Sequence, residues 1–115
     1  MPELKNKIHG LSLRVPVAAG SITDLTVEVR KPTTDQEVNE LLRNCAAYHL
    51  NGVMDYSDDP LVSSDIIGNP HSVIIDPTLT KVEDGVLVKI IGWYDNEWGF
   101  SNRMVEIAKL IGNLQ

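Results

Sequence analysis

Alternating apolar and polar residues in the first third of the chain predict two β-strands. Residues 11–16 (LSLRVP) alternate and stop at a proline, and residues 24–31 (DLTVEVRK) alternate again before Pro32. Successive side chains of a strand point to opposite faces, so each segment would present one apolar face to a core. We therefore expect two strands, joined by a loop that contains Gly20.

A capped helix is predicted next. Thr34 and Glu37 have the spacing of a capping box, in which each side chain accepts a hydrogen bond from the other residue's backbone N–H. The apolar residues that follow recur on one helical face: Val38, Leu41, Leu42, Cys45 and Ala46. This spacing is typical of an amphipathic helix that packs on a sheet.

Further strands are expected in the second half of the chain. Residues 52–56, 61–66 and 71–76 are short apolar segments separated by the turn-forming sequences DDP and GNP, and we interpret them as an antiparallel meander. Residues 86–94 follow an Asp-Gly turn and are apolar on both faces, as in a central strand that is covered on both sides.

A final helix is expected from about Ser101. Its apolar residues form a stripe wider than one sheet covers: Met104, Val105, Ile107, Ala108, Leu110 and Ile111. We therefore expect it to contact something beyond its own sheet. The predicted fold is α+β, with a mixed or antiparallel sheet, one capped helix on the sheet and a C-terminal helix, in one unit over residues 1–115.

Composition narrows the possible partners and the compartment. The 115 residues carry a formal charge of −6 and ten Lys and Arg residues without a dense run, which argues against nucleic-acid and anionic-membrane partners. No apolar run is long enough to span a bilayer, and the N-terminus lacks a signal-peptide layout. With one cysteine there is no internal disulfide, and we expect a cytoplasmic protein.

Four of the six aromatic residues lie within eight positions: Trp93, Tyr94, Trp98 and Phe100. Trp93 continues the alternation of the strand. Trp98 and Phe100 can fill the corner where the strand passes into the helix. Asp95 and Asn96 stand at the end of that strand, before the helix, where α/β proteins often carry functional side chains. A side-chain amide at this position can donate and accept at once, which suits another amide.

Arg14 is a second candidate, because it lies on the polar face of a predicted strand before a turn. A guanidinium there can offer a bidentate fork to a phosphate or carboxylate. The residues alone favour the other interpretation, an exposed arginine without a ligand. Cys45 and His49 are four residues apart on the capped helix and could meet as a thiolate and its base. The cysteine lies on the apolar stripe, however, where a free cysteine is a small buried hydrophobic residue, so we do not expect a catalytic pair.

The remaining acidic and histidine residues suggest no catalytic group or metal site. The aspartates of DYSDDP (residues 55–60) lack the order and the distant glutamate of a calcium loop. His9 and His71 have no partner at ligand spacing. We therefore expect neither a catalytic residue nor a metal ligand in this chain.

Five stretches carry a family resemblance: PELKNKIHGLSLRVP, SITDLTVEV, LVSSDI, HSVIID and WYDNEWGFSNR. Through them the chain resembles the C-terminal part of phosphorylating glyceraldehyde-3-phosphate dehydrogenase, essentially end to end, and WYDNEWG is highly specific to that family. The resemblance implies a homotetrameric oxidoreductase of glycolysis or gluconeogenesis. In it a cysteine thiolate attacks the aldehyde of glyceraldehyde 3-phosphate, hydride passes to NAD or NADP, and inorganic phosphate releases the acyl group.

The resemblance also assigns two site residues. Arg14, in LRVP, matches the arginine that holds the phosphates of substrate and of inorganic phosphate, and Asn96, in YDNE, matches the asparagine that orients the nicotinamide carboxamide. On this interpretation the aromatic residues hold the strand and the helix together, so that the Asn96 side chain keeps its direction toward the nicotinamide. Phe100 stands where the family commonly has tyrosine.

Other family features do not occur in the 115 residues. There is no Gly-x-Gly-x-x-Gly of a Rossmann domain, no Ser-Cys-Thr-Thr-Asn nucleophile motif and no histidine that follows it. We therefore expect a C-terminal fragment of the catalytic domain that is inactive alone and binds no cofactor tightly. A fragment of an erythrose-4-phosphate dehydrogenase and a non-catalytic binding or oligomerisation module remain alternatives.

Overall fold

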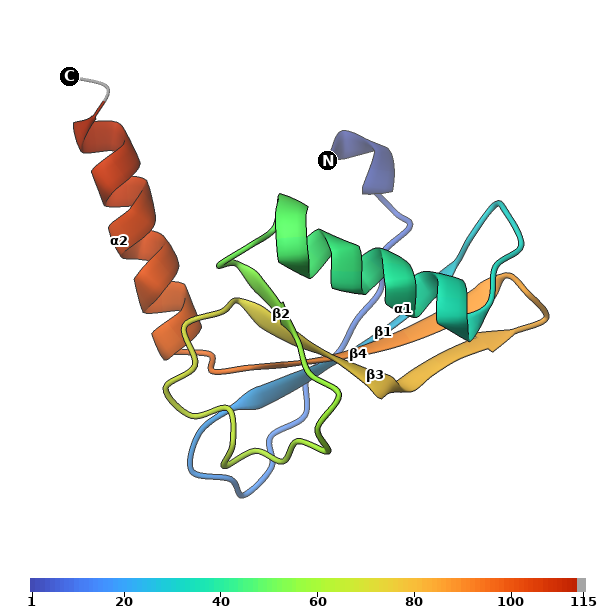
Figure 1. The fold of residues 1–115 in the computed structure, drawn as a ribbon, viewed down its shortest axis with the longest axis horizontal. Helices are drawn as coiled ribbons and strands as arrows, with labels where there is room; N and C mark the ends of the chain where they lie inside the picture. The colour runs from blue at the N-terminus through green and yellow to red at the C-terminus, as the bar shows by residue number, and fades with distance from the viewer. Residues whose placement is uncertain (114–115) are drawn as a thin grey trace.

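A four-stranded mixed sheet is the centre of the molecule in the computed structural model, which describes residues 1–113 (Figure 1). The strands are β1 (Ser21–Glu28), β2 (Met54–Tyr56), β3 (Val73–Glu83) and β4 (Leu87–Tyr94), in the spatial order β1-β4-β3-β2. Two helices, α1 (Asp35–Asn44) and α2 (Trp98–Gly112), accompany them, with a short 3-10 turn at Pro2–Leu4. The predicted α+β class is confirmed.

β4 is one of the two inner strands of the sheet, and its sequence predicts such a central position. It pairs antiparallel with β1 on one side and with β3 on the other. Val88 and Ile91 are three residues apart, so they face opposite sides of the sheet, and both are buried. The turn before β4 has positive φ at Asp84 and Gly85, the pair of left-handed conformations that an Asp-Gly hairpin turn requires.

The helix α1 begins at its predicted cap. The Thr34 hydroxyl accepts from the Glu37 N–H at 3.2 Å, and the Glu37 carboxylate accepts from the Thr34 N–H at 3.0 Å. The helix continues into a π-helical turn at Cys45–His49 and packs against β3 and β2. Val38 and Ala46 are buried on the predicted face, whereas Leu41 of the same stripe is 62 % exposed.

The antiparallel meander predicted for residues 52–76 is wrong. β2 is short and runs parallel to β3, and the 16 residues between them bring the chain back to the same end of the sheet. Residues 61–66 form turns instead of a strand, because the Asp65 carboxylate accepts from the Val62 N–H at 2.8 Å and the Val62 carbonyl accepts from the Asp65 N–H at 2.9 Å. Such local bonds compete with a sheet ladder.

The strand predicted at residues 11–16 is also absent. Residues 5–18 are exposed and contain neither helix nor strand. An extended segment forms a strand only when a neighbouring strand supplies its hydrogen-bond partners, and no strand of the described residues lies beside this one. We call residues 5–18 the N-terminal arm.

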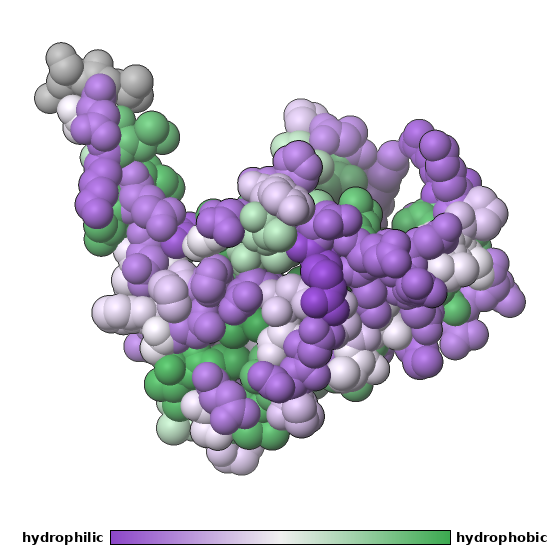
Figure 2. Space-filling model, in the orientation of Figure 1, coloured by the Kyte–Doolittle hydropathy of each residue, from purple (hydrophilic) through white to green (hydrophobic). Residues whose placement is uncertain are grey.

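The C-terminal helix begins at Trp98, three residues before the predicted start, and projects away from the sheet (Figure 1). Its large apolar side chains are more than half exposed: Trp98, Phe100, Met104, Val105, Ile107, Leu110 and Ile111. Figure 2 shows apolar residues along one side of this helix and polar residues along the other. No helix among the described residues is both long enough and apolar enough to pass through a bilayer.

Candidate functional site

The corner between β4 and α2 carries the candidate residue Asn96 and is organised by the residue before it. Asp95 is only 6 % exposed. Its carboxylate Oδ1 accepts from the N–H groups of Glu97 at 3.0 Å and Trp98 at 2.9 Å, and its carbonyl accepts from the Gly99 N–H at 3.1 Å. Asp95 therefore caps the start of α2, although it lies three residues before the first helical residue.

The second carboxylate oxygen of Asp95 reaches a distant part of the chain. Oδ2 accepts from the Gly68 N–H at 2.9 Å, across a separation of 27 residues. The hydrogen bonds from Gly68, Trp98 and Glu97 lower the pKa of Asp95 below its ordinary value, against the opposing effect of burial. The side chain is thus ionised at neutral pH, with both oxygens engaged.

Asn96 lies on the outside of this fixed corner. The residue is exposed, and within residues 1–113 its side-chain amide has no hydrogen-bond partner. Its Nδ2 can therefore donate to an incoming group and its Oδ1 can accept from one.

A tight backbone contact adds a second connection between the corner and the loop before β3. A Cβ atom at Gly99 would lie 2.7 Å from the carbonyl oxygen of His71. The first turn of α2 therefore approaches this loop as closely as only glycine permits. Further along the helix, the Arg103 Nη1 donates to the Gly52 carbonyl at 3.0 Å.

The aromatic residues hold the corner less than the sequence suggests. Trp93 does anchor the end of β4, because its indole N–H donates to the buried Asp76 carboxylate at 3.3 Å. Trp98 and Phe100 do not fill the corner, since they are 51 % and 65 % exposed. The polar contacts of Asp95 fix the corner instead.

Arg14 lies in the N-terminal arm, not on a strand. Its side chain is exposed, and it takes part in no hydrogen bond or ion pair among the described residues. No such contact joins it to Asn96 either. The guanidinium is thus free to meet an anion, but nothing in residues 1–113 fixes its direction.

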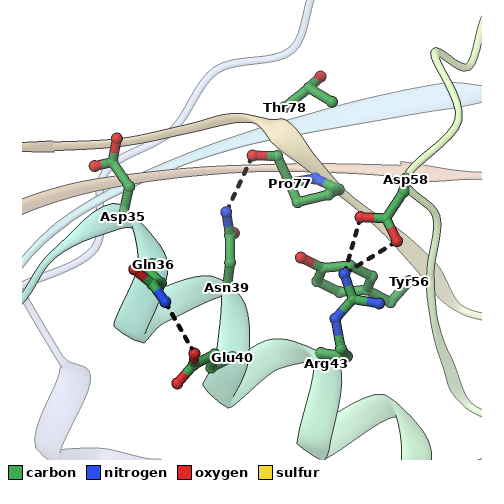
Figure 3. Close-up of a pocket in the computed structure, with 9 residues that line it drawn as sticks. All are labelled: Asp35, Gln36, Asn39, Glu40, Arg43, Tyr56, Asp58, Pro77 and Thr78. Atoms are coloured by element: carbon green, nitrogen blue, oxygen red, sulfur yellow. Dashed lines mark hydrogen bonds and ion pairs between the residues drawn. The ribbon is translucent and has the colours of Figure 1, made fainter.

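A shallow groove lies elsewhere, between α1, the end of β2 and the middle of β3, with a volume of about 620 Å³ (Figure 3). Arg43 crosses it, with Nη2 at 2.9 and 3.0 Å from the two Asp58 carboxylate oxygens and the guanidinium carbon 4.3 Å from the centre of the Tyr56 ring. Asn39 donates to the Pro77 carbonyl at 3.2 Å. Because its cation is already paired and neither Arg14 nor Asn96 lines it, the groove does not belong to the candidate site.

The cysteine and the histidines form no reactive cluster. Cys45 is a free, half-buried thiol in the π-helical turn, with His49 at the end of that turn. The His71 Nδ1 lies 2.9 Å from the Asn69 Oδ1 and 3.7 Å from an Asp55 carboxylate oxygen. Among residues 1–113 no group of three or more His, Cys, Asp or Glu side chains is arranged to hold a metal ion.

Sequence reasoning locates Asn96 at a strand end but misses its support. The sequence does contain a signal for this support. Asp95 lies two residues before Glu97 and three before Trp98, which is the spacing of a helix cap. Gly68 carries no such signal, because a backbone N–H donor exists at almost every position.

Comparison with known proteins places this corner in a family. Residues 1–96 match the family model for the C-terminal domain of glyceraldehyde 3-phosphate dehydrogenase, so α2 lies beyond the matched part. The chain is 50 % identical over 113 residues to glyceraldehyde-3-phosphate dehydrogenase 2 of Streptomyces avermitilis. The aligned residues cover 98 % of this chain and 34 % of that protein.

Two further relatives agree. The glyceraldehyde-3-phosphate dehydrogenases of Mycobacterium avium and Streptomyces coelicolor are 49 % and 48 % identical, over 97 % and 98 % of this chain and 33 % and 34 % of their own lengths. The chain thus spans about a third of the length of these relatives. It belongs to the glyceraldehyde 3-phosphate dehydrogenase family and corresponds to the C-terminal domain of that family.

Proposed function

We propose that this chain is the C-terminal part of an NAD(P)-dependent phosphorylating glyceraldehyde-3-phosphate dehydrogenase that acts in glycolysis or gluconeogenesis. The observation that carries the proposal is the exposed amide of Asn96, which has no hydrogen-bond partner within residues 1–113 and follows the fixed Asp95 in the part that matches the family model. Residues 1–115 supply binding groups to this enzyme, and the nucleophile belongs to a longer polypeptide.

Asn96 is the proposed nicotinamide contact. A carboxamide offers one acceptor oxygen and one donor nitrogen, and the Asn96 amide offers the complementary pair. The donor and acceptor of the Asn96 amide therefore fit the nicotinamide carboxamide, and the bound dinucleotide would supply the hydride acceptor. Asn96 itself would orient that ring, because two hydrogen bonds to a planar amide fix its rotation.

Arg14 is the proposed phosphate contact. Its guanidinium can form two parallel hydrogen bonds to phosphate oxygens, which a lysine ammonium cannot do. In this role Arg14 would hold the phosphate of glyceraldehyde 3-phosphate and the inorganic phosphate that attacks later. Its exposure, and the lack of a partner for it within residues 1–113, support this assignment.

The chain alone would have no dehydrogenase activity. It contains no Ser-Cys-Thr-Thr-Asn motif, and without a thiolate nucleophile and its base no covalent intermediate forms. It would not bind NAD or NADP tightly, since one amide provides few contacts. We propose a cytoplasmic homo-oligomer, supported by the exposed apolar side of α2.

The test is to join residues 1–115 to the upstream part of the Streptomyces avermitilis relative. We expect this joined enzyme to form NADH or NADPH from glyceraldehyde 3-phosphate, the oxidised dinucleotide and phosphate, whereas purified residues 1–115 form none. Arg14→Lys in the joined enzyme should lower kcat/KM about ten- to a hundred-fold, the effect of losing a charge-assisted hydrogen bond. Asn96→Ala should weaken dinucleotide binding and leave phosphate binding unchanged.

Arg30→Lys provides a matched control, because Arg30 is also exposed and has no ion pair or side-chain hydrogen bond among the described residues. It should leave kcat/KM unchanged. A folded joined enzyme without activity would contradict the proposed function. Equal effects of Arg14→Lys and Arg30→Lys would contradict only the phosphate role of Arg14.

A further inference from the structure

The carboxylate of Asp95 connects the Asn96 corner to a loop far away in the sequence. One oxygen serves the local turn, through the N–H groups of Glu97 and Trp98, and the other accepts from Gly68 at 2.9 Å. The local bonds alone would be enough to start α2. The bond to Gly68 has a different effect, because it fixes the corner relative to the loop over residues 61–69.

That loop is itself firmly held at one point. Ile66 is completely buried, and the Asn69 N–H donates to its carbonyl at 3.0 Å. Gly20, just before β1, packs closely on Ile66, since a Cβ there would lie 2.9 Å from the Ile66 Cδ1. The loop therefore contacts both the start of β1 and, through Gly68, the end of β4.

We propose that Asp95 is a positioning residue for dinucleotide binding: through its hydrogen bond to Gly68 it holds Asn96 in the direction that meets the carboxamide. This inference rests on the proposed role of Asn96. Asp95 does not touch the ligand, because its side chain is buried and both of its oxygens bond to backbone N–H groups.

Only an ionised carboxylate satisfies all three donors at once. An asparagine at position 95 has one acceptor oxygen and one NH₂ group, so it must direct a donor toward either Gly68 or the pair Glu97 and Trp98. Asp95→Asn therefore preserves the size of the side chain and breaks one side of the connection.

The experiment is a double-mutant cycle on dinucleotide affinity in the joined enzyme, with the dissociation constant measured by calorimetry. We expect Asn96→Ala and Asp95→Asn each to weaken binding about ten-fold, the size of one lost hydrogen bond to a charged or well-placed group. The double variant should be no weaker than Asn96→Ala alone, because Asp95 acts only through Asn96.

A control separates positioning from general stability. Asp35→Asn changes another carboxylate that accepts from a distant backbone N–H, that of Val82 at 2.7 Å, and that makes no hydrogen bond to the corner or to Trp93 among the described residues. Its effect on dinucleotide affinity should be small and additive with Asn96→Ala. If Asp95→Asn is also additive with Asn96→Ala, the positioning role is wrong. If Asn96→Ala alone changes nothing, the nicotinamide role of Asn96 fails, and the inference about Asp95 fails with it.

Hydrogen exchange at the Gly68 amide of residues 1–115 tests the hydrogen bond to Asp95 directly, without an activity assay and without a variant. The Gly68 amide should exchange with solvent more slowly than the amide of Gly10 in the exposed N-terminal arm, because the Asp95 carboxylate protects it. Equal exchange, corrected for sequence, would show that the connection does not exist in solution and would overturn the proposal.

Discussion

Gly99→Ala tests the contact between the first turn of α2 and the loop before β3. A Cβ at this position would lie 2.7 Å from the His71 carbonyl oxygen, whereas ordinary contacts begin at 3.4 Å, so the helix and the loop must separate by roughly 0.7 Å. The corner cannot yield freely, because Asp95 holds it with hydrogen bonds to Gly68, Glu97 and Trp98.

Two opposing terms decide the size of this effect. Overpacking of this kind costs about 1 to 3 kcal/mol, and replacing glycine by alanine inside a helix returns roughly 0.5 to 1 kcal/mol. We therefore expect Gly99→Ala to lower the free energy of unfolding by about 0 to 2.5 kcal/mol. Urea unfolding followed by the fluorescence of Trp93 and Trp98 measures this difference.

Gly112→Ala is the matched control at the other end of the same helix. A Cβ at Gly112 would meet nothing within 4 Å, so only the helix-propensity term remains. This variant should be unchanged or more stable by up to about 1 kcal/mol. If Gly99→Ala is stabilised to the same extent, the close approach to His71 is not present in solution, and only the hydrogen bonds of Asp95 hold the corner.

Three further predictions concern the cap, acid stability and association. Thr34→Ala should cost about 1 kcal/mol in urea unfolding, since it removes the acceptor for the Glu37 N–H, and an unchanged midpoint would contradict the capping box. The pKa of Asp95 is lowered in the folded state, so its stabilisation is complete above the ordinary aspartate pKa and is lost as pH falls through the folded value. Asp95→Asn should therefore flatten the fall of stability below about pH 4, and a parallel fall would refute this. Residues 1–115 should self-associate through α2 at tens of micromolar, and a folded 12.7 kDa species in light scattering would refute that.

Local signals predicted the elements whose conformation depends on neighbouring residues. The capping box of Thr34 and Glu37, the Asp-Gly turn before β4 and the two-faced apolar pattern of β4 are confirmed. Each involves residues a few positions apart, and short-range geometry is enough to specify it.

Segments whose conformation depends on distant partners were predicted wrongly. Residues 11–16 alternate as a strand does but have no neighbouring strand among the described residues. In residues 61–66 the Val62 N–H bonds to the Asp65 carboxylate instead of to a neighbouring strand. The parallel pairing of β2 with β3 also depends on the path of the 16 connecting residues. An apolar pattern shows that a segment could form a strand, and it does not show which edge receives it.

The same division between local and distant partners holds for the candidate site. The position of Asn96 at a strand end is readable from the sequence, and so is the cap formed by Asp95. The partner Gly68, 27 residues earlier, is not, because any backbone N–H could take that role. The sequence predicts that Trp98 and Phe100 fill the corner, but the polar contacts of Asp95 hold it. The exposure of these two aromatic side chains depends on the angle at which α2 leaves the sheet, which the sequence does not show.

Arg14 and Asn96 therefore differ in how much of their geometry this chain supplies. Asn96 follows a residue held by three hydrogen bonds from within residues 1–113, so its backbone direction is set before any ligand arrives. Arg14 lies in an exposed arm and has no partner in the described part of the chain. Ordering such a side chain costs up to about 2 kcal/mol, with about 1 to 2 kcal/mol more for each backbone residue fixed. A phosphate contact alone offsets little of that cost. A strand that paired with residues 11–16 would fix the arm beforehand and so lower this cost, whereas the hydrogen bonds of Asp95 already hold the nicotinamide half of the proposed site.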